Sequence, residues 1–137
     1  MGLDQFAYKT KVKPSKPVDF QEEVYGDDVK REEIHYWRKH PNVHGFMEEI
    51  YREKGGEHSF NCRPVELTQE DIDLLAESIL DGELPETSGF FFGQSFGVMW
   101  LFEKHGIWIR ENDDLEFCKK ASEAIKEGYM VFYDSWW

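Results

Sequence analysis

Long apolar runs and cysteines are scarce in this sequence of 137 residues. No stretch approaches the roughly 20 consecutive apolar residues that a membrane-spanning helix requires. The first residues carry neither the basic segment nor the apolar segment of a secretion signal. The two cysteines, Cys62 and Cys118, fall in different expected elements, which favours free thiols in a reducing compartment over a disulfide. The sequence therefore predicts a cytoplasmic protein that does not interact with membranes.

Basic residues are also few, with 16 Lys and Arg against 28 Asp and Glu and a formal net charge of -12. Such a chain repels a phosphate backbone, so we expect no direct binding to nucleic acid. From Pro64 to Glu103 the sequence has acidic residues and no Lys or Arg. This segment predicts either a solvated face that keeps the protein soluble or a surface for a basic partner protein. The residues that would contact such a partner are Glu70, Asp73 and Glu77.

The common motifs of nucleotide and metal sites are missing as well. No Walker-type phosphate loop is present, and no dinucleotide fingerprint follows an expected strand. Ser95 in GQSFG has the spacing of a nucleophile elbow, but a loop between glycines is the simpler interpretation. His40 and His44 have the four-residue spacing of a zinc-binding pair on a helix, yet Pro41 interrupts that helix. We therefore expect no metal and no cofactor.

Aromatic side chains are abundant instead: the sequence has 11 Phe, 6 Tyr and 5 Trp. Chains with so many aromatic residues bury enough apolar surface to fold, and this length is typical of one domain. We predict an α+β or α/β fold in a single compact domain over residues 1–137. About four helices would pack on a small mixed sheet of roughly four to five strands.

The spacing of apolar residues predicts the individual elements. Helices are expected over residues 28–39, 42–54, 68–81 and 112–127. Strands are expected over residues 2–9, 60–67, 89–93 and 129–134, with a hairpin over 98–109 whose first half could instead be helical. Both terminal strands are expected in the sheet. Lys9, Lys11 and Lys13 repeat at period two at the end of the first strand and indicate that it lies at an exposed edge.

The last expected strand has apolar side chains on both of its faces. Met130 and Phe132 lie on one face, and Val131 and Tyr133 lie on the other. This pattern is typical of a central strand that is covered on both sides.

The stretch WRKHPN, residues 37–42, combines cationic, aromatic and helix-capping residues. If a helix begins at Asn42, its free N–H groups together with Arg38, Lys39 and His40 would attract an anion. Alternatively, the stretch is a polar helix corner in which His40 or Asn42 bonds to backbone donors.

Trp136 and Trp137 close the sequence and allow three interpretations. The indoles could cover the end of the hydrophobic core. They could form the aromatic wall of a ligand pocket with Trp37 and Tyr36, since ring-stacking surfaces bind flat molecules. They could also anchor a partner protein, because Trp is enriched in interface hot spots. The candidates for ligand binding are therefore Trp37, Arg38, Lys39, His40, Asn42, Trp136 and Trp137.

Several segments, in collinear order, resemble a family of small proteins common in bacteriophage genomes. They are MGLDQFAY, WRKHPNVHGFMEEIY, FNC, ELT, LPETSGFFFG, DLEF and YDSWW, which together span nearly the whole chain. The resemblance implies a phage-encoded protein in the cytoplasm of the infected bacterium. It implies no particular activity: relatives are sometimes labelled phosphoglycerate kinase, but a chain of this length without a nucleotide loop does not support that label.

Two functions compete on this basis. The first is that of a small acidic accessory protein that binds a host protein, a phage protein or a small anionic or aromatic molecule without turning it over. The second is an enzyme acting on a phosphorylated or nucleotide-like substrate, since imidazole is a natural proton carrier near neutral pH. Its candidate residues are Arg38 and Lys39 for the anion, His40 or His44 as general acid or base, and Asp4 or Asp134 as the orienting carboxylate.

Overall fold

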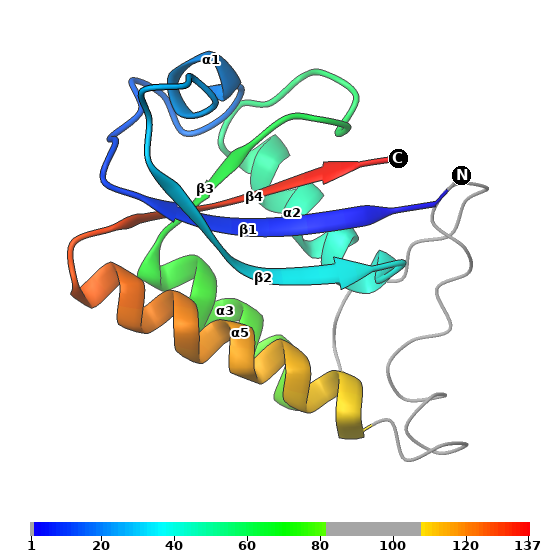
Figure 1. Ribbon diagram of the computed structural model, residues 1–137. Helices are drawn as coiled ribbons and strands as arrows, with labels where there is room; N and C mark the ends of the chain where they lie inside the picture. The colour runs from blue at the N-terminus through cyan, green and yellow to red at the C-terminus, as the bar shows by residue number, and fades with distance from the viewer. Residues whose placement is uncertain (1, 82–107) are drawn as a thin grey trace.

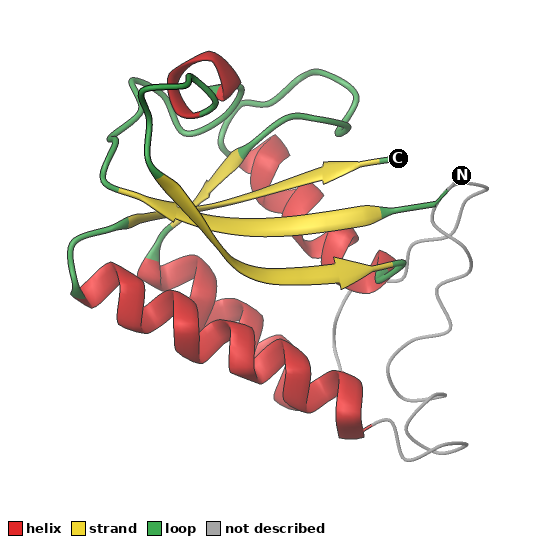
Figure 2. Cartoon of the chain, in the orientation of Figure 1, coloured by secondary structure: helices red, strands yellow, loops and turns green. Residues whose placement is uncertain are grey.

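The computed structural model describes residues 2–81 and 108–137, which form four helices and four strands (Figure 1). In chain order these are β1 (Asp4–Thr10), α1 (Gln21–Val24), β2 (Arg31–Arg38), α2 (Pro41–Glu53), β3 (Val65–Leu67), α3 (Gln69–Asp81), α5 (Trp108–Lys126) and β4 (Met130–Trp136). One sheet contains all four strands, including the first and the last, and helices pack against it (Figure 2). The predicted α+β class is therefore confirmed.

The sheet has the strand order β2-β1-β4-β3, and every neighbouring pair is antiparallel. The prediction of a mixed sheet is wrong in this respect. Between β3 and β4 the chain runs out along α3 and back along α5 (Figure 1). β4 therefore starts at the end of the sheet where β3 stops, and the two strands pair as antiparallel neighbours.

β1 lies between β2 and β4, so the exposed edge predicted from its lysines is wrong. Lys9 pairs instead with Glu32 of β2, with Nζ 3.2 Å from the carboxylate. Lys11 and Lys13 donate to backbone carbonyl oxygens just after the end of α5. Cations are favoured there because the C-terminal end of a helix carries the negative pole of its dipole. Lys9 thus joins the first strand to β2, whereas Lys11 and Lys13 attach the following loop to the end of α5.

Two hydrophobic cores cover the two faces of the sheet. The larger core contains side chains of α2, α3 and α5 and of all four strands. The smaller core lies under α1 and consists of Phe20, Val24, Met130 and Phe132. In β4, Val131 and Tyr133 belong to the larger core, whereas Met130 and Phe132 belong to the smaller one. The prediction of a central last strand covered on both faces is therefore confirmed.

The helix predicted over residues 28–39 is wrong, because most of this segment is the strand β2. Val29 and Trp37 fit a helical stripe, but the side chains alternate in the structure, with His35 and Trp37 buried and Tyr36 exposed. β1 pairs with β2 along the whole length of the strand, and aromatic side chains are favourable in strands. Pairing with a segment distant in sequence outweighs the local helical spacing.

Three other predicted elements agree with the structure. The helices predicted over 42–54 and 68–81 are α2 and α3, and the strand predicted over 129–134 is β4. The strand predicted over 60–67 is reduced to β3. The reason is that Cys62 has a φ of 60°, which an extended backbone does not contain.

The start of the last helix differs from the prediction. α5 begins at Trp108, earlier than the helix predicted over 112–127. The hairpin predicted over 98–109 is therefore wrong at its last two residues. The rest of that hairpin, the strand predicted over 89–93 and Ser95 lie outside the described residues.

Candidate functional site

The candidate site lies where β2 ends and α2 begins. Lys39 has a φ of 54°, in the left-handed region, and turns the chain from the strand toward the helix. Its backbone amide donates to the carbonyl oxygen of Leu3 at 2.8 Å, which ties this turn to the segment before β1. Arg38 and Lys39 are thereby held at one end of the sheet.

Three neighbouring strands bring Arg38, Asp4 and Trp136 into one row. Asp4 of β1 lies opposite Arg38 of β2 and opposite Trp136 of β4. Residues that lie directly opposite each other in an antiparallel pair point to the same face of the sheet. The adjacent residues Gln5 and Trp37 are buried toward the helical layer, so this row lies on the face opposite to α3 and α5.

A cleft with a volume of about 390 Å³ contains this row. It is lined by Gly2, Asp4, Arg38, Lys39, Trp136 and Trp137. Its size falls within the range of small-molecule sites, which combine apolar walls with a few polar groups. The indole of Trp136 forms an open wall, because this residue is 64% exposed. Two cations, one carboxylate and two indoles therefore converge at one end of the sheet.

Trp137 is held in place by the segment before β3. Its indole Nε1 donates to the carbonyl oxygen of Phe60 at 2.8 Å. Asn61 accepts from the Trp137 amide at 3.0 Å and donates to the Trp137 carbonyl oxygen at 2.9 Å. The two tryptophans thus differ: Trp137 is anchored by hydrogen bonds, whereas Trp136 presents its ring to solvent. No pattern in the sequence marks Asn61 for this role.

Tyr36 connects the cleft to the rest of the exposed sheet face. Its hydroxyl donates to Asp4 Oδ1 at 2.5 Å, and 44% of the residue is exposed. The hydrogen bond to Asp4 raises the pKa of Tyr36, so its hydroxyl keeps its proton and remains a donor at neutral pH. The Phe6 ring lies 5.3 Å from the Tyr36 ring, between centroids. Aromatic side chains therefore continue from the cleft along β1 and β2.

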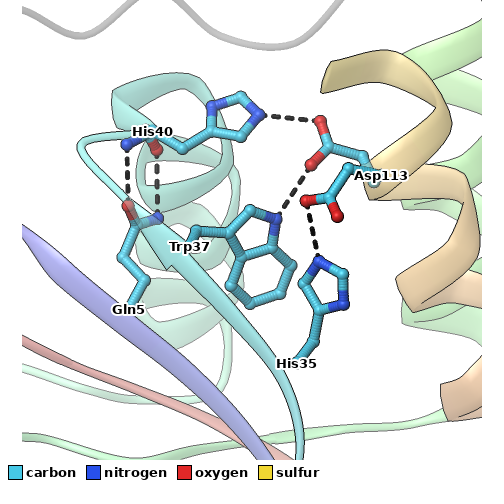
Figure 3. A network of polar contacts seen from close by, with 6 residues as sticks. Gln5, His35, Trp37, His40 and Asp113 are labelled. Carbon is cyan, nitrogen blue, oxygen red and sulfur yellow. Dashed lines mark hydrogen bonds and ion pairs between the residues drawn. The ribbon is translucent and has the colours of Figure 1, made fainter. Parts of the chain in front are cut away.

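Trp37 and His40 belong to a buried polar network on the other side of the sheet (Figure 3). Asp114 of α5 accepts from Trp37 Nε1 at 2.8 Å and lies 2.7 Å from His40 Nε2. Gln5 of β1 accepts from the His40 amide at 2.8 Å and donates to the His40 carbonyl oxygen at 3.0 Å. All four residues are buried. The network joins β1, β2 and α5 at the start of α2. Its role is therefore structural.

A second contact between α5 and β2 lies beside this network (Figure 3). His35 Nε2 is 2.9 Å from the carboxylate of Asp113, whose side chain is 49% exposed. In the helix predicted over residues 112–127, Asp113 would lie at the very start. Because α5 starts at Trp108, Asp113 and Asp114 lie inside the helix and contact β2 instead.

The sequence-based ligand candidates are thus divided between two places. Arg38, Lys39, Trp136 and Trp137 line the cleft. Trp37, His40 and Asn42 are buried in the core, so the structure does not bring them to the cleft. The alternation of β2 separates Trp37 from Arg38, and the sequence, read as a helix, could not show this. The N-cap of α2 is His40 and not Asn42, and the His40 side chain makes no capping hydrogen bond, so the polar-corner interpretation is not confirmed for His40.

The proposed catalytic groups are not brought together. His44 is buried on the helical side, and its Nδ1 lies 2.8 Å from the Tyr133 hydroxyl. Burial lowers the pKa of His44 to about 3, so the imidazole is neutral at pH 7. Asp134 lies on the opposite face of β4 and accepts from the Tyr25 hydroxyl at 2.5 Å. Burial raises the pKa of Asp134 to about 6. The sheet separates this carboxylate from both His40 and His44.

The predicted partner surface lies on α3. Glu70, Asp73 and Glu77 are exposed there. Leu74, between them, is 51% exposed. An exposed leucine surrounded by acidic side chains is compatible with either a solvated face or a contact surface for a basic partner.

Residues 2–81 and 108–137 contain no group of three or more His, Cys, Asp or Glu side chains placed to hold a metal ion. No helix within these ranges is long and apolar enough to cross a membrane. Comparison with protein-family models, with curated proteins and with solved structures finds no match for this chain. The site must therefore be judged from its own geometry.

Proposed function

We propose that the protein binds, without turning it over, a small molecule that carries a planar ring and an anionic group. The observation that supports this is the row of Arg38, Asp4 and Trp136 in one cleft, with Lys39 beside it. An exposed indole stacks on flat rings, and a guanidinium binds carboxylates and phosphates through paired hydrogen bonds. Such a ligand satisfies both halves of the cleft at once.

The net charge of -12 does not oppose an anion at this place. The first 63 residues contain 11 basic and 12 acidic residues, whereas residues 64–137 contain 5 basic and 16 acidic residues. Arg38, Lys39 and Asp4 belong to the nearly neutral first part. α3, on the other side of the sheet, has five acidic residues and no basic one and supplies much of the acidic excess. At physiological ionic strength the Debye length is about 8 Å, so charges on the far side are largely screened.

The family resemblance suggests where such binding would take place. We propose that the protein is a phage-encoded accessory factor in the cytoplasm of the infected bacterium. A binding role fits the separation of His44 and Asp134 by the sheet, because general acid and base catalysis requires both groups within reach of one substrate.

The proposal can be tested with phenyl phosphate, a minimal molecule with one ring and one phosphate. We expect saturable quenching of tryptophan fluorescence by phenyl phosphate, and much weaker effects of phenol or inorganic phosphate alone. Trp136→Ala should abolish the quenching, and Arg38→Gln should weaken binding by about tenfold or more, since a charge-assisted hydrogen bond contributes roughly 1.5–3 kcal/mol. Native mass spectrometry of gently purified protein should also show a retained small molecule.

Two control variants separate the cleft from the rest of the surface. Leu74→Ala and Lys119→Met remove an exposed apolar side chain and an exposed cation on α3 and α5. Both should bind phenyl phosphate like the unchanged protein. If phenyl phosphate does not bind and no small molecule is retained, the cleft is not a ligand site and the proposal fails.

A second candidate function is favoured by Leu74, which is exposed between Glu70, Asp73 and Glu77. In it, α3 binds a basic segment of a host or phage protein, with the leucine as apolar contact and the acids as charge complement. Replacing the three acids by lysine should abolish capture of a basic partner from lysate, whereas Lys119→Met should not. Capture that survives the charge reversal would eliminate this function.

A further inference from the structure

We infer that the ligand of the cleft is a nucleoside monophosphate, and this inference rests on the proposed function of the cleft as a small-molecule site. The base would stack on Trp136, the ribose hydroxyls would donate to Asp4, and the phosphate would bind Arg38 and Lys39. The chemical types in the row follow the same order as the three parts of this ligand class.

The order of the row is set by the strand order. Arg38 is on β2, Asp4 on β1 and Trp136 on β4, and these three strands are consecutive neighbours in the sheet. Neighbouring strands are about 4.8 Å apart, so the backbone positions of Arg38 and Trp136 are about 10 Å apart. A ligand that reaches both must have its ring and its anionic group separated by a spacer. In a nucleoside monophosphate the ribose is that spacer.

Asp4 determines which hydrogen-bonding groups the spacer must carry. A carboxylate only accepts hydrogen bonds, so a group beside it must be a donor, and an anion beside it is repelled. One of its oxygens accepts from the Tyr36 hydroxyl at 2.5 Å, and a carboxylate has about four acceptor positions, so further donors can be accommodated. Neighbouring ribose hydroxyls supply two donors. An acidic residue that binds ribose hydroxyls is the arrangement found in dinucleotide-binding folds, although this fold is different.

On β4 the exposed aromatic surface is large enough for one base. Beyond Trp136 on the same face of β4 come Asp134 and Phe132. Phe132 is covered by Tyr25, whose ring centroid is 6.0 Å away, and Asp134 is buried beneath the Tyr25 hydroxyl. The segment around α1 therefore ends the stacking surface on β4 after the first row, while Tyr36 continues the aromatic surface on β2. The net charge also opposes a polyanion, as the sequence predicted.

The inference is tested by isothermal titration calorimetry with AMP, GMP, CMP and UMP. We expect at least one of them to bind at least tenfold more tightly than phenyl phosphate. For that nucleotide, the nucleoside without phosphate and ribose 5-phosphate without base should each bind at least tenfold more weakly. Trp136→Ala and Arg38→Gln should each weaken binding of the nucleotide by about tenfold or more.

The role of Asp4 has its own test. The 2′,3′-dideoxy form of the bound nucleotide should bind about tenfold more weakly than the ribose form in the unchanged protein. In Asp4→Asn, which keeps an acceptor for Tyr36, the two forms should bind nearly equally. Asp27→Asn is the matched control, because Asp27 is an exposed carboxylate outside the cleft, and it should keep the full discrimination.

The outcomes distinguish this inference from the proposed function. If phenyl phosphate binds but no nucleotide binds more tightly, the cleft is a ligand site and the nucleotide inference is wrong. A dideoxy form that binds as well as the ribose form would also overturn the inference, as would tighter binding of a short single-stranded oligonucleotide than of any mononucleotide. If neither phenyl phosphate nor a nucleotide binds, both proposals fail.

Discussion

At the scale of single residues, burial shifts the pKa of two side chains of the last strand and α2 in opposite directions. Asp134 is a buried carboxyl whose pKa rises from 3.8 to about 6 because the charged form loses hydration. His44 is a buried imidazole whose pKa falls from 6.5 to about 3 for the same reason. The two groups therefore change the stability of the fold with opposite signs as the pH falls.

Asp134→Asn should stabilise the protein at neutral pH. Between about pH 4 and pH 6 the folded protein holds a proton on Asp134 that the unfolded chain has released, so this contribution to stability is lost as the pH rises through about 6. This rise in pKa corresponds to about 3 kcal/mol. Asparagine keeps an acceptor for Tyr25. Urea unfolding at pH 4 and pH 7 should show the variant gaining stability relative to the unchanged protein over that interval, and a constant difference would contradict the assignment.

His44 should dominate the loss of stability in acid. Its neutral form is required in the fold, so its contribution is complete above about pH 6.5 and is lost as the pH falls toward 3. This fall in pKa corresponds to about 5 kcal/mol. His44→Gln should be less stable at pH 7, since the contact with Tyr133 is changed, but its stability should depend less on pH between 6.5 and 3. Guanidinium titrations across this interval measure both effects, and parallel pH profiles would refute the prediction.

At the scale of elements, α5 is attached to β2 by two adjacent aspartates in unlike surroundings. Asp114 is fully buried and binds Trp37 and His40, whereas Asp113 is half exposed and binds His35. Apolar side chains of α5 pack in the larger core, and the buried polar contact between α5 and β2 is made by Asp114.

Asp114→Ala should destabilise the fold by about 3 kcal/mol or more, because the indole N–H of Trp37 and the Nε2 of His40 lose this partner in a buried place. Asp113→Ala is the matched control on the same helix and should cost about 1 kcal/mol or less, since exposed ion pairs contribute little. Chemical unfolding of both variants gives the comparison. Equal losses would mean that Asp114 does not fasten α5 to β2.

At the scale of the whole molecule, charge is distributed unevenly. The acidic excess lies in residues 64–137, which include α3 and α5, while the part that includes β1, β2 and α2 is nearly neutral. Within residues 64–137, α3 has five acidic residues and no basic one, and like charges this close together repel each other and lower the stability of the compact state.

Salt should therefore stabilise this protein. Raising the ionic strength from about 0.01 M to about 0.15 M shortens the Debye length from about 30 Å to about 8 Å. The shorter Debye length screens the repulsion between the acidic side chains of α3. We expect the Tm to rise by about 3 °C or more, as a gain of about 1 kcal/mol would produce in a domain of this size. Glu70→Gln combined with Glu77→Gln should reduce the salt effect. A Tm that is unchanged or lower in salt would show that repulsion between the acidic side chains of α3 is negligible.

The sequence by itself determined the elements whose pattern is local. α2 and α3 have apolar residues at helical spacing and clear ends, so the local pattern predicts both helices, which the packing of their apolar faces then stabilises. β4 has apolar residues on both faces, which only a central strand can bury. The net charge and the aromatic content are properties of the composition. The α+β class follows from local patterns of residue types along the chain.

Strand pairing and the contacts between residues distant in the sequence arise only in the folded chain. β2 is a strand because β1 pairs with it, and this places Trp37 in the core and Arg38 at the cleft. Asp4 and Trp136 become neighbours only through the pairing of β1 with β4. Asn61 and Asp114 have roles that exist only once the chain is folded. Contacts between residues this far apart depend on strand pairing and packing of the whole chain, which leave no local periodicity in the sequence.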